Sequence, residues 1–395
     1  MSVLIGKSRG HATLYMKGAP EVVLSKCVAE RIGEQDVSLS DERRQYWLRI
    51  NAEMASKALR VLGLAFRHVD RADAVQISEQ GLTFAGLAGM IDPPREEVRD
   101  AVNTCRSAGI RPVMITGDHP ATAIAVAREL GIASADDLAV TGTELDGLTD
   151  EALASQIERI TVYARVTAEH KLRIVQAWKS RDHVVAMTGD GVNDAPAIRA
   201  ADIGIAMGIT GTDVTKEASD MILTDDNFAS IVNAVEEGRG IYDNIQKVLW
   251  FLLSCNCGEI LLMLVASLVG WPAPLLPIQL LWINLVTDGL PALALSLEPP
   301  EPGVMSRRPR ASRSSILSWD VAWVILAQGL LVGGVALAAF GYMYMTSPNA
   351  LDEARAMVFC VLVYAELFRA LAARSRWLTC PQLGFFTNPL LLAAV

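Results

Sequence analysis

Residues 188–197 read Thr-Gly-Asp-Gly-Val-Asn-Asp-Ala-Pro-Ala, and this run indicates the fold of the chain around it. It follows the apolar segment His183–Met187, which predicts a short buried strand. Upstream, the apolar segment Pro112–Ile115 ends in the same way, in Thr116-Gly117-Asp118. Ligands of open parallel sheets bind at the carboxyl ends of the strands, so the two Thr-Gly-Asp turns predict a site at one sheet edge.

Helical and apolar segments alternate on both sides of these turns. We expect helices over Arg95–Ser107, Pro120–Leu130 and Ala168–Lys179, and a further short strand over Ile203–Ala206. This alternation predicts an α/β domain with a parallel sheet over residues 86–242.

The residues at the two turns suit phosphoryl transfer. Glycines let backbone N–H groups approach phosphate oxygens, and helix N-termini favour anions. Asp190 is expected to hold Mg²⁺, which prefers one or two carboxylates together with phosphate oxygens and water. Asn193 and Asp194 would orient the bound group, and Lys171 would place a positive charge beside the transferring phosphoryl. A single Gly-Asp turn caps many strands, whereas the run of ten residues is much more specific.

The second half of the chain has a different composition. Hydrophobic residues make up 51% of the sequence and concentrate in long uncharged runs beyond residue 245. A bilayer crossing needs roughly 20 mostly apolar residues. This length predicts four spans, at Val248–Trp271, Leu275–Leu297, Val321–Met345 and Ala356–Ala373, and a fifth apolar stretch begins at Pro389.

The charged residues between the spans predict an orientation. The segment Ser306–Arg313 contains four arginines, and Arg369, Arg374 and Arg376 lie around the end of the fourth span. The segment Ser347–Glu353 carries acidic residues and no basic one. By the positive-inside rule the arginine-bearing loops are cytoplasmic, which also places residues 1–245 in the cytoplasm. The chain is therefore expected to be a multi-pass protein of the lipid bilayer, and its net charge of −9 argues against a nucleic-acid partner.

Polar side chains inside the predicted spans are the candidates for ion binding. An ionisable group at the centre of a membrane helix costs roughly 2.5–3.5 kcal/mol on insertion scales, so it usually has a function. Pro291 lacks an N–H group and should free the carbonyl of Thr287, four residues earlier. Hard cations such as Ca²⁺ prefer six to eight oxygen ligands of this kind. The alternative is that these groups only pack helix against helix through hydrogen bonds. The candidate ligands are Asn256, Glu259, Asn284, Thr287, Asp288 and Glu366.

Two cysteines flank the first of these ligands. Cys255 and Cys257 could indicate a soft-metal site. Residues two apart on a helix point to different faces, so buried structural thiols are the favoured interpretation.

Several motifs in the chain resemble those of P-type cation-transporting ATPases, a branch of the haloacid dehalogenase-like fold. Residues 188–197 resemble the hinge motif of that family. Other matching motifs are Lys17-Gly-Ala-Pro-Glu21, Ala58-Leu-Arg60-Val61, Asp92-Pro-Pro-Arg95, Met114-Ile-Thr-Gly-Asp118 and the segment from Ala164 to Lys171. In the predicted spans, Asn256-Cys-Gly-Glu259 resembles the fifth transmembrane helix of the calcium-pump class. Residues 284–292 resemble the sixth helix, and Glu366 falls where the eighth supplies a ligand.

The resemblance implies a pump that forms an aspartyl-phosphate from ATP and couples it to cation movement, most simply the export of Ca²⁺ from the cytoplasm. It implies three parts: residues 1–85 from a nucleotide-binding domain, residues 86–242 from the phosphorylation domain, and residues 243–395 forming a helical membrane domain. Asp190 would bind Mg²⁺, and the six membrane residues would coordinate the ion. The residues implied around ATP and its phosphates are Lys17, Arg60, Thr116, Gly117, Asp118, Arg165, Lys171 and Asn193.

The chain also departs from the family pattern. It contains no Asp-Lys-Thr-Gly-Thr motif with the phosphorylated aspartate and no Thr-Gly-Glu motif. It has no segment resembling the actuator domain or the first four transmembrane helices, and its end falls inside the ninth. We therefore expect a C-terminal portion of a pump that is inactive alone in ATP hydrolysis and transport. The expected origins are a fragmentary gene or a split pump whose missing half lies on a second chain.

Other functions stay open at this stage. A membrane-anchored phosphohydrolase of the same superfamily would need an Asp-x-Asp nucleophile pair, which the phosphorylation domain lacks. A non-catalytic remnant or regulatory protein is distinguished by whether a partner chain carries the missing aspartate. Within the pumps, those for Na⁺/K⁺, H⁺ or Mn²⁺ share most of this scaffold.

Overall fold

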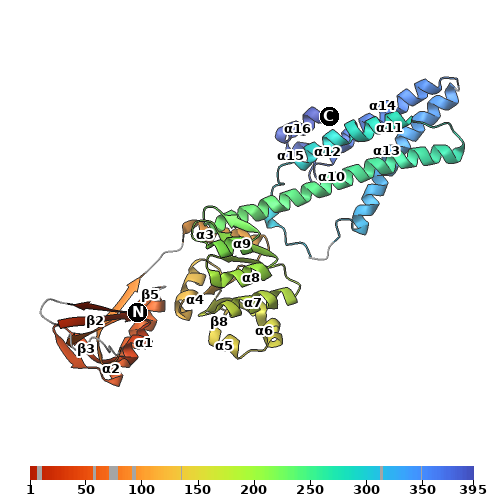
Figure 1. Cartoon of the computed structure of the whole chain (residues 1–395). Coiled ribbons are helices and arrows are strands. Elements are labelled where there is room, and N and C mark those ends of the chain that lie inside the picture. The colour runs from red at the N-terminus through yellow and green to blue at the C-terminus, as the bar shows by residue number, and fades with distance from the viewer. Residues whose placement is uncertain are drawn as a thin grey trace. The chain divides into compact units, whose positions relative to one another are not determined.

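The chain forms two compact units in the computed structural model, which describes residues 1–6, 11–56, 59–70, 79–90, 95–134, 136–311, 315–347 and 349–395. The first unit comprises Met1–Arg106 and Ile110–Ser230, and the second comprises Ser107–Gly109 and Ile231–Val395 (Figure 1). Each unit is described separately below.

The first unit begins with a six-stranded sheet of order β1-β2-β5-β6-β3-β4, in which only the β3–β6 pair is parallel. Buried residues of the strands and of α1 form its core, including Leu14, Val23, Leu82 and Phe84. The elements are β1 Ser2–Gly6, β2 His11–Gly18, α1 Pro20–Ser25, β3 Cys27–Ile32, β4 Gln35–Ser38, α2 Asp41–Ser56, β5 Arg60–Asp70 and β6 Leu82–Met90.

The rest of the first unit alternates helices with parallel strands, as the sequence predicts. The strands form two three-stranded sheets, of order β7-β9-β8 and β10-β11-β12, where a single sheet was expected. The strands are β7 Met114–Thr116, β8 Leu138–Thr141, β9 Ile160–Ala164, β10 Ala186–Gly189, β11 Ile203–Met207 and β12 Met221–Leu223. The helices are α3 Glu96–Ser107, α4 Pro120–Glu129, α5 Gly142–Asp146, α6 Asp150–Gln156, α7 Ala168–Ser180, α8 Ala195–Ala200 and α9 Asp213–Ala218.

Helix α7 packs against the strands of both small sheets. Its residues Ile174 and Trp178 are buried in a cluster with Tyr163 of β9. On an adjacent face of the same helix, Val175 is buried with Met187 of β10. Two apolar faces on one helix thus bring the strand ends of the two sheets to its N-terminus.

The second unit consists of helices, and α10 is the longest of them. It runs from Phe228 to Val269 and so begins well before the first predicted span. The other helices are α11 Pro277–Trp282, α12 Gly289–Ser296, α13 Trp319–Thr346, α14 Leu351–Ala372, α15 Cys380–Leu383 and α16 Pro389–Ala394.

Three helical segments among the described residues are long and apolar enough to cross a membrane: Phe228–Val269, Pro277–Ser296 and Trp319–Thr346. They overlap the first three predicted spans almost completely, although the first segment ends before Trp271 and the second is shorter than predicted at both ends. Helix α14 covers the fourth, but it is not one of the three, and it carries the charged residues Asp352, Glu353, Arg355, Glu366 and Arg369. Its crossing of a membrane stays a prediction.

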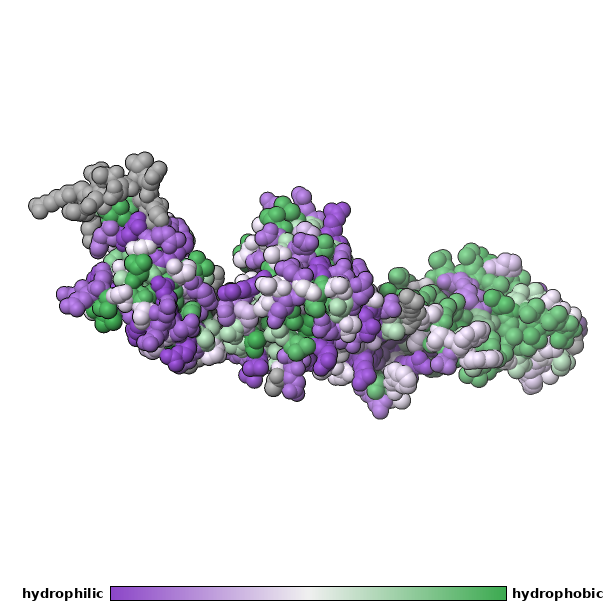
Figure 2. Space-filling model, turned by 90° about the horizontal axis from the view of Figure 1, so that it is seen from below, coloured by the Kyte–Doolittle hydropathy of each residue, from purple (hydrophilic) through white to green (hydrophobic). Residues whose placement is uncertain are grey.

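The outer surface of these helices is hydrophobic. Green, apolar residues cover the helices of the second unit on the face that Figure 2 shows. Leu268, Leu285, Leu293 and Leu331 are each at least 67% exposed. Leucines exposed at this density suit contact with lipid better than contact with water.

Helices α10 and α13 approach each other through glycines. A Cβ atom on Gly333 of α13 would lie 2.5 Å from the carbonyl oxygen of Gly258 on α10. A Cβ atom on Gly329, one turn earlier, would lie 2.7 Å from the Cβ of Cys257. Small residues four apart let membrane helices pack backbone against backbone. This contact fixes α10 at the turn that carries Glu259.

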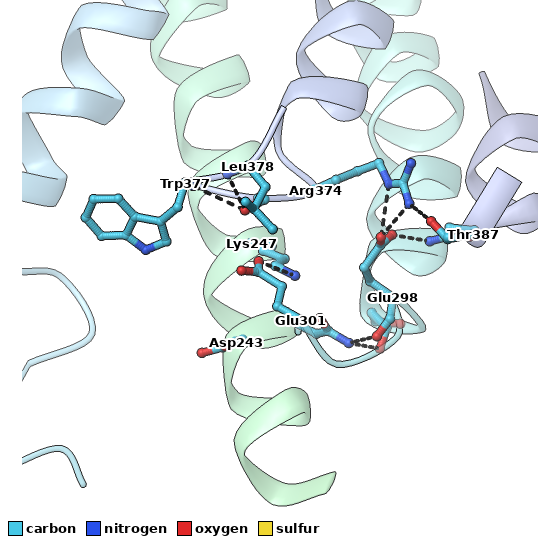
Figure 3. A network of polar contacts seen from close by, with 12 residues as sticks. Asp243, Lys247, Glu298, Glu301, Arg374, Trp377, Leu378 and Thr387 are labelled. Carbon is cyan, nitrogen blue, oxygen red and sulfur yellow. Dashed lines mark hydrogen bonds and ion pairs between the residues drawn. The ribbon is translucent and has the colours of Figure 1, made fainter. Parts of the chain in front are cut away.

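A buried ion pair holds the segment that follows α12 (Figure 3). Arg374, which is 2% exposed, donates from Nη2 to Glu298 Oε1 at 2.7 Å and from Nε to the same atom at 3.0 Å. The amide of Asn388, just before α16, donates to Glu298 Oε2 at 2.6 Å. Every charge in this cluster is hydrogen-bonded, which is the condition for burying an ion pair without a large penalty. The ends of α12 and α14 are thereby linked to the start of α16.

The glycine contact generates a stability prediction. Gly333→Ala should destabilise the chain by about 1–3 kcal/mol, because the added methyl group meets backbone that cannot move aside. Gly334→Ala is the matched control, since a Cβ atom there meets nothing within 4 Å. Thermal unfolding in detergent micelles measures the difference, and equal melting temperatures for the two variants would show that the helices do not touch here.

Candidate functional site

The loop after β10 is fixed by Asp194. Asp194 is buried, and its Oδ2 accepts hydrogen bonds from the backbone N–H groups of Asp190 and Gly191, both at 3.3 Å. Its Oδ1 is paired with Lys171 Nζ. Asp190 and Asn193 are exposed in the same loop. Asp194 and Lys171 therefore position the loop, and the carboxylate of Asp190 stays open to solvent.

Gly189 is required where β10 enters this loop. A Cβ atom at this position would lie 2.5 Å from the Cβ of Asp194. This distance is too short for two non-bonded carbon atoms, so only glycine fits here. On the other side of the loop, the carbonyl oxygen of Asp190 accepts from Thr212 N at 3.0 Å and from Thr215 Oγ1 at 3.1 Å. Asp190 is thus held by its backbone from two directions.

The Thr116-Gly117-Asp118 turn follows β7 and closes on itself. Thr116 Oγ1 donates to Asp118 Oδ2 at 3.0 Å and accepts from Asp118 N at 3.1 Å. Gly117 and Asp118 are exposed. Next to the turn, desolvation by burial and then the Arg165 guanidinium lower the pKa of His119, against a smaller opposing effect of Glu21.

The connection from β9 to α7 reaches both turns. The N–H of Arg165 donates to Asp118 O at 3.2 Å, and the N–H of Val166 donates to Thr116 O at 3.4 Å. Arg165 has a φ of 52°, a left-handed conformation that non-glycine residues rarely adopt and that concentrates at functional sites. Six residues on, Lys171 reaches Asp194. The structure therefore joins the two turns through this connection, although they follow strands of two different small sheets and not one sheet edge as the sequence predicts.

Helix α7 begins at a capping box that orients its first turn. The side chain of Thr167 accepts from the N–H of His170, and His170 Nδ1 accepts from the N–H of Thr167 at 3.1 Å. The other ring nitrogen of His170 lies 2.8 Å from Asp146 Oδ1. These contacts fix the helix start from which Lys171 extends.

Two of the residues predicted around the nucleotide, Lys17 and Arg60, belong to strands of the N-terminal sheet. Lys17 is exposed at the end of β2, which pairs with β5, the strand that contains Arg60. The side chain of Arg60 and residues 92–94 of the Asp92-Pro-Pro-Arg95 motif lie outside the described residues. Arg95 is described, and its Nη1 donates to the carbonyl oxygen of Asp226 at 3.3 Å.

In the second unit, the helix around Asp288 is irregular. Residues Ile283–Thr287 form a π-helical turn between α11 and α12, in which the N–H of Asp288 donates to Ile283 O at 3.0 Å. This turn ends at Thr287, the residue whose carbonyl Pro291 is predicted to free. π-Helical turns widen a helix and occur frequently at functional sites. Thr287 and Asp288 are both buried, at 3% and 1% exposure.

Two helical turns carry the candidate ligands side by side. Cys255 Sγ and carboxylate oxygens of Asp288 and Glu366 all lie within 4.8 Å of one another, and we call this the thiol rung. One turn further along the two helices, Asn284 Nδ2 donates to Glu259 Oε2 at 2.9 Å, and we call this pair the amide rung. Residues four apart on a helix share a face, so Cys255 with Glu259 and Asn284 with Asp288 each line the same side.

Most oxygen atoms of the acidic side chains in this group, and the hydroxyl of Thr287, are buried without a hydrogen-bond donor. Glu366 is fully buried, and Glu259 is 6% exposed. Among the described residues, no N–H or O–H donor reaches Glu259 Oε1, Thr287 Oγ1, either oxygen of Asp288 or either oxygen of Glu366. Native proteins satisfy nearly all buried polar groups, so a set of converging, unsatisfied oxygens indicates that a ligand belongs there. Carboxylate and hydroxyl oxygens are ligands that hard divalent cations prefer.

The structure gives two side chains near this set surroundings that the sequence interpretation does not predict. Cys255 was interpreted as a structural thiol, yet its sulfur lies among the carboxylates. Its spacing of four residues from Glu259 was the available signal. The amide of Asn256, a predicted ligand, instead donates to Leu252 O of its own helix at 2.9 Å.

Two models of known protein families match this chain, one at each end. A family model described as "P-type ATPase, cytoplasmic domain N" matches residues 1–97, and one described as "Cation transporting ATPase, C-terminus" matches residues 272–395. The calcium-transporting ATPase 1 of Bacillus cereus is 46% identical over 393 residues, covering 95% of this chain and 44% of that protein. The calcium-transporting ATPase of Bacillus subtilis is 44% identical over 377 residues, with coverages of 95% and 42%.

Similarity extends to eukaryotic proteins. The calcium-transporting ATPase 1 of Schizosaccharomyces pombe is 41% identical over 390 residues, covering 96% of this chain and 42% of that protein. The chain thus spans somewhat less than half the length of the curated relatives it matches. The matches at both ends, together with this identity along nearly the whole chain, show that it belongs to the P-type ATPase family.

Proposed function

We propose that this chain is part of an ATP-driven cation pump and that Ca²⁺ is the ion it transports. The observation that carries the proposal is the group of unsatisfied oxygens on Asp288 and Glu366. Leaving a buried carboxylate without a partner costs several kcal/mol. A transported cation that arrives and leaves explains why the protein itself provides no permanent partner.

The identity of the ion is supported by ligand chemistry and by the relatives. Ca²⁺ takes carboxylate, amide and backbone oxygens in flexible geometry, and Glu259, Asn284, Thr287, Asp288 and Glu366 supply the first two kinds together with a hydroxyl. The three relatives described above are named calcium-transporting ATPases. Pumps for Na⁺/K⁺, H⁺ or Mn²⁺ are the alternatives within the same family.

The first unit would provide the phosphoryl-transfer part of the pump. We propose that its parallel strands belong to a haloacid dehalogenase-like fold, that Asp190 holds Mg²⁺, and that Thr116, Asp118 and Asn193 face the nucleotide phosphates. Lys171 acts through Asp194 on the position of the loop. The division at residues 85 and 242, and the nucleotide contacts of Lys17, Arg60 and Arg165, belong to the same proposal.

Helix α10 offers the route by which the two activities would be coupled. It carries the proposed ligand Glu259 and, more than five turns before it, Arg239. Arg239 donates to the carbonyl oxygens of Ala108 at 2.8 Å and Val304 at 3.0 Å. Near it, the buried Lys247 Nζ lies 3.1 Å from Glu301 Oε1 (Figure 3). A movement of the chain after α3 would therefore act directly on the helix that binds the ion.

The ion site generates a binding prediction. Asp288→Asn should lower the affinity of the detergent-solubilised chain for radioactive calcium at least about tenfold, because calcium affinity follows the number of charged ligands. Asp320→Asn is the control, since Asp320 is exposed at the start of α13. Equal calcium binding by the two variants would place the ion elsewhere.

The cytoplasmic loop generates a second prediction. Asp194→Ala should speed hydrogen exchange at the amides of Asp190 and Gly191 by roughly fivefold to tenfold, because each loses a hydrogen bond worth about 1 kcal/mol. Asn193→Ala alters an exposed neighbour and should leave these rates unchanged. Exchange measured by mass spectrometry decides the matter, and unchanged protection in Asp194→Ala would mean that the loop is held by Thr212 and Thr215 alone.

A further inference from the structure

A thiol lies among the carboxylates of the cation site. Cys255 is fully buried, and its sulfur is within 4.8 Å of carboxylate oxygens from Asp288 and Glu366. Among the described residues, no N–H or O–H group donates to either oxygen of these two carboxylates. The three ligand atoms come from different parts of the bundle. Cys255 lies in α10, Asp288 is the N-cap residue of α12, and Glu366 lies in α14.

The second cysteine of this helix turn faces a different neighbour. A Cβ atom on Gly329 of α13 would lie 2.8 Å from the sulfur of Cys257, so Cys257 packs at the glycine contact between α10 and α13. Cys255 shares its helix face with Glu259 instead. The position of the partly buried Cys257 is explained by helix packing, whereas packing does not explain why the sulfur of Cys255 lies beside two carboxylates that no N–H or O–H group satisfies.

We infer that the thiol rung is a binding site for thiophilic divalent cations such as Cd²⁺ or Zn²⁺, with Cys255 Sγ as a metal ligand beside Asp288 and Glu366. This inference rests on the proposed function in one respect only, namely that the membrane helices bind a cation. On binding, the S–H bond breaks, a metal–sulfur bond forms, and the proton is released to solvent, with no change of oxidation state.

The ligand atoms of the two rungs favour different kinds of cation, as this inference requires. Thiolate is a soft ligand that Zn²⁺ binds readily, at about 2.3 Å, whereas Ca²⁺ binds oxygen. The amide rung offers oxygen ligands only, from Glu259 and Asn284, and with Asp288 and Glu366 it would serve a hard ion. The thiol rung adds sulfur to two carboxylates, and Zn²⁺ binds both thiolate sulfur and carboxylate oxygen. Because Asp288 and Glu366 are also among the proposed calcium ligands, Ca²⁺ and Cd²⁺ should compete.

The test is cadmium binding by the full chain, purified in detergent micelles. Cd²⁺ bound to a thiolate shows a charge-transfer absorption band in the ultraviolet, which does not depend on enzymatic turnover. The unaltered chain and Cys257→Ser should both show the band when Cd²⁺ is added. Cys255→Ser should lose it or require at least about tenfold more Cd²⁺, since even an outer-shell partner of a metal is worth that factor. Added Ca²⁺ should reduce the band.

The outcomes separate this inference from the proposed function. An identical band in Cys255→Ser overturns the inference, and calcium binding measured on the same sample shows whether the proposed function survives. Asp288→Asn retains the thiol and should also weaken the band, so a misfolded Cys255→Ser protein, detected by circular dichroism, does not leave the question open. A strong cadmium band in a chain that fails to bind calcium would support the thiol rung and contradict the proposed transported ion.

Discussion

A carboxylate buried in an apolar helix bundle needs hydrogen-bond donors or a cation beside it. The second unit buries three carboxylates that have too few such partners. Glu259, Asp288 and Glu366 are all buried, and five of their six oxygens meet no donor among the described residues. The cost of such groups is several kcal/mol each. A structure that keeps them must hold the surrounding helices firmly, and the glycine contact of α10 with α13 and the Glu298–Arg374 pair do so on two sides. The π-helical turn adds the width that lets Thr287 and Asp288 point inward together.

In the loop after β10, by contrast, the buried carboxylate has hydrogen-bond partners. Asp194 is buried too, but Lys171 and two backbone N–H groups satisfy it, and its role is to hold the loop in place. The exposed Asp190 beside it is left free for a ligand. In both units, then, burial and hydrogen bonding distinguish side chains that position from side chains that bind. This distinction rests on partners and not on residue type.

Much of this organisation could be predicted from the sequence. The parallel strands, the helices α3, α4 and α7, and the first three apolar spans follow from local periodicity, and the structure contains them. Other features depend on contacts between distant residues. The split into two small sheets is decided by strand pairing, which periodicity does not encode. The position of Cys255 depends on how α10 is rotated against α12 and α14, and the glycines of α13 set that rotation. The contact of Asn256 with Leu252 O of its own helix, at a position where the sequence predicts an ion ligand, depends on the same rotation.

The most direct test of the cation site is a structure determined with calcium present, in which the ion is located by its anomalous scattering. The account predicts a calcium position within roughly 2.3–2.6 Å of carboxylate oxygens of both Asp288 and Glu366. Calcium bound away from these residues, with both carboxylates taking protein donors instead, would contradict it.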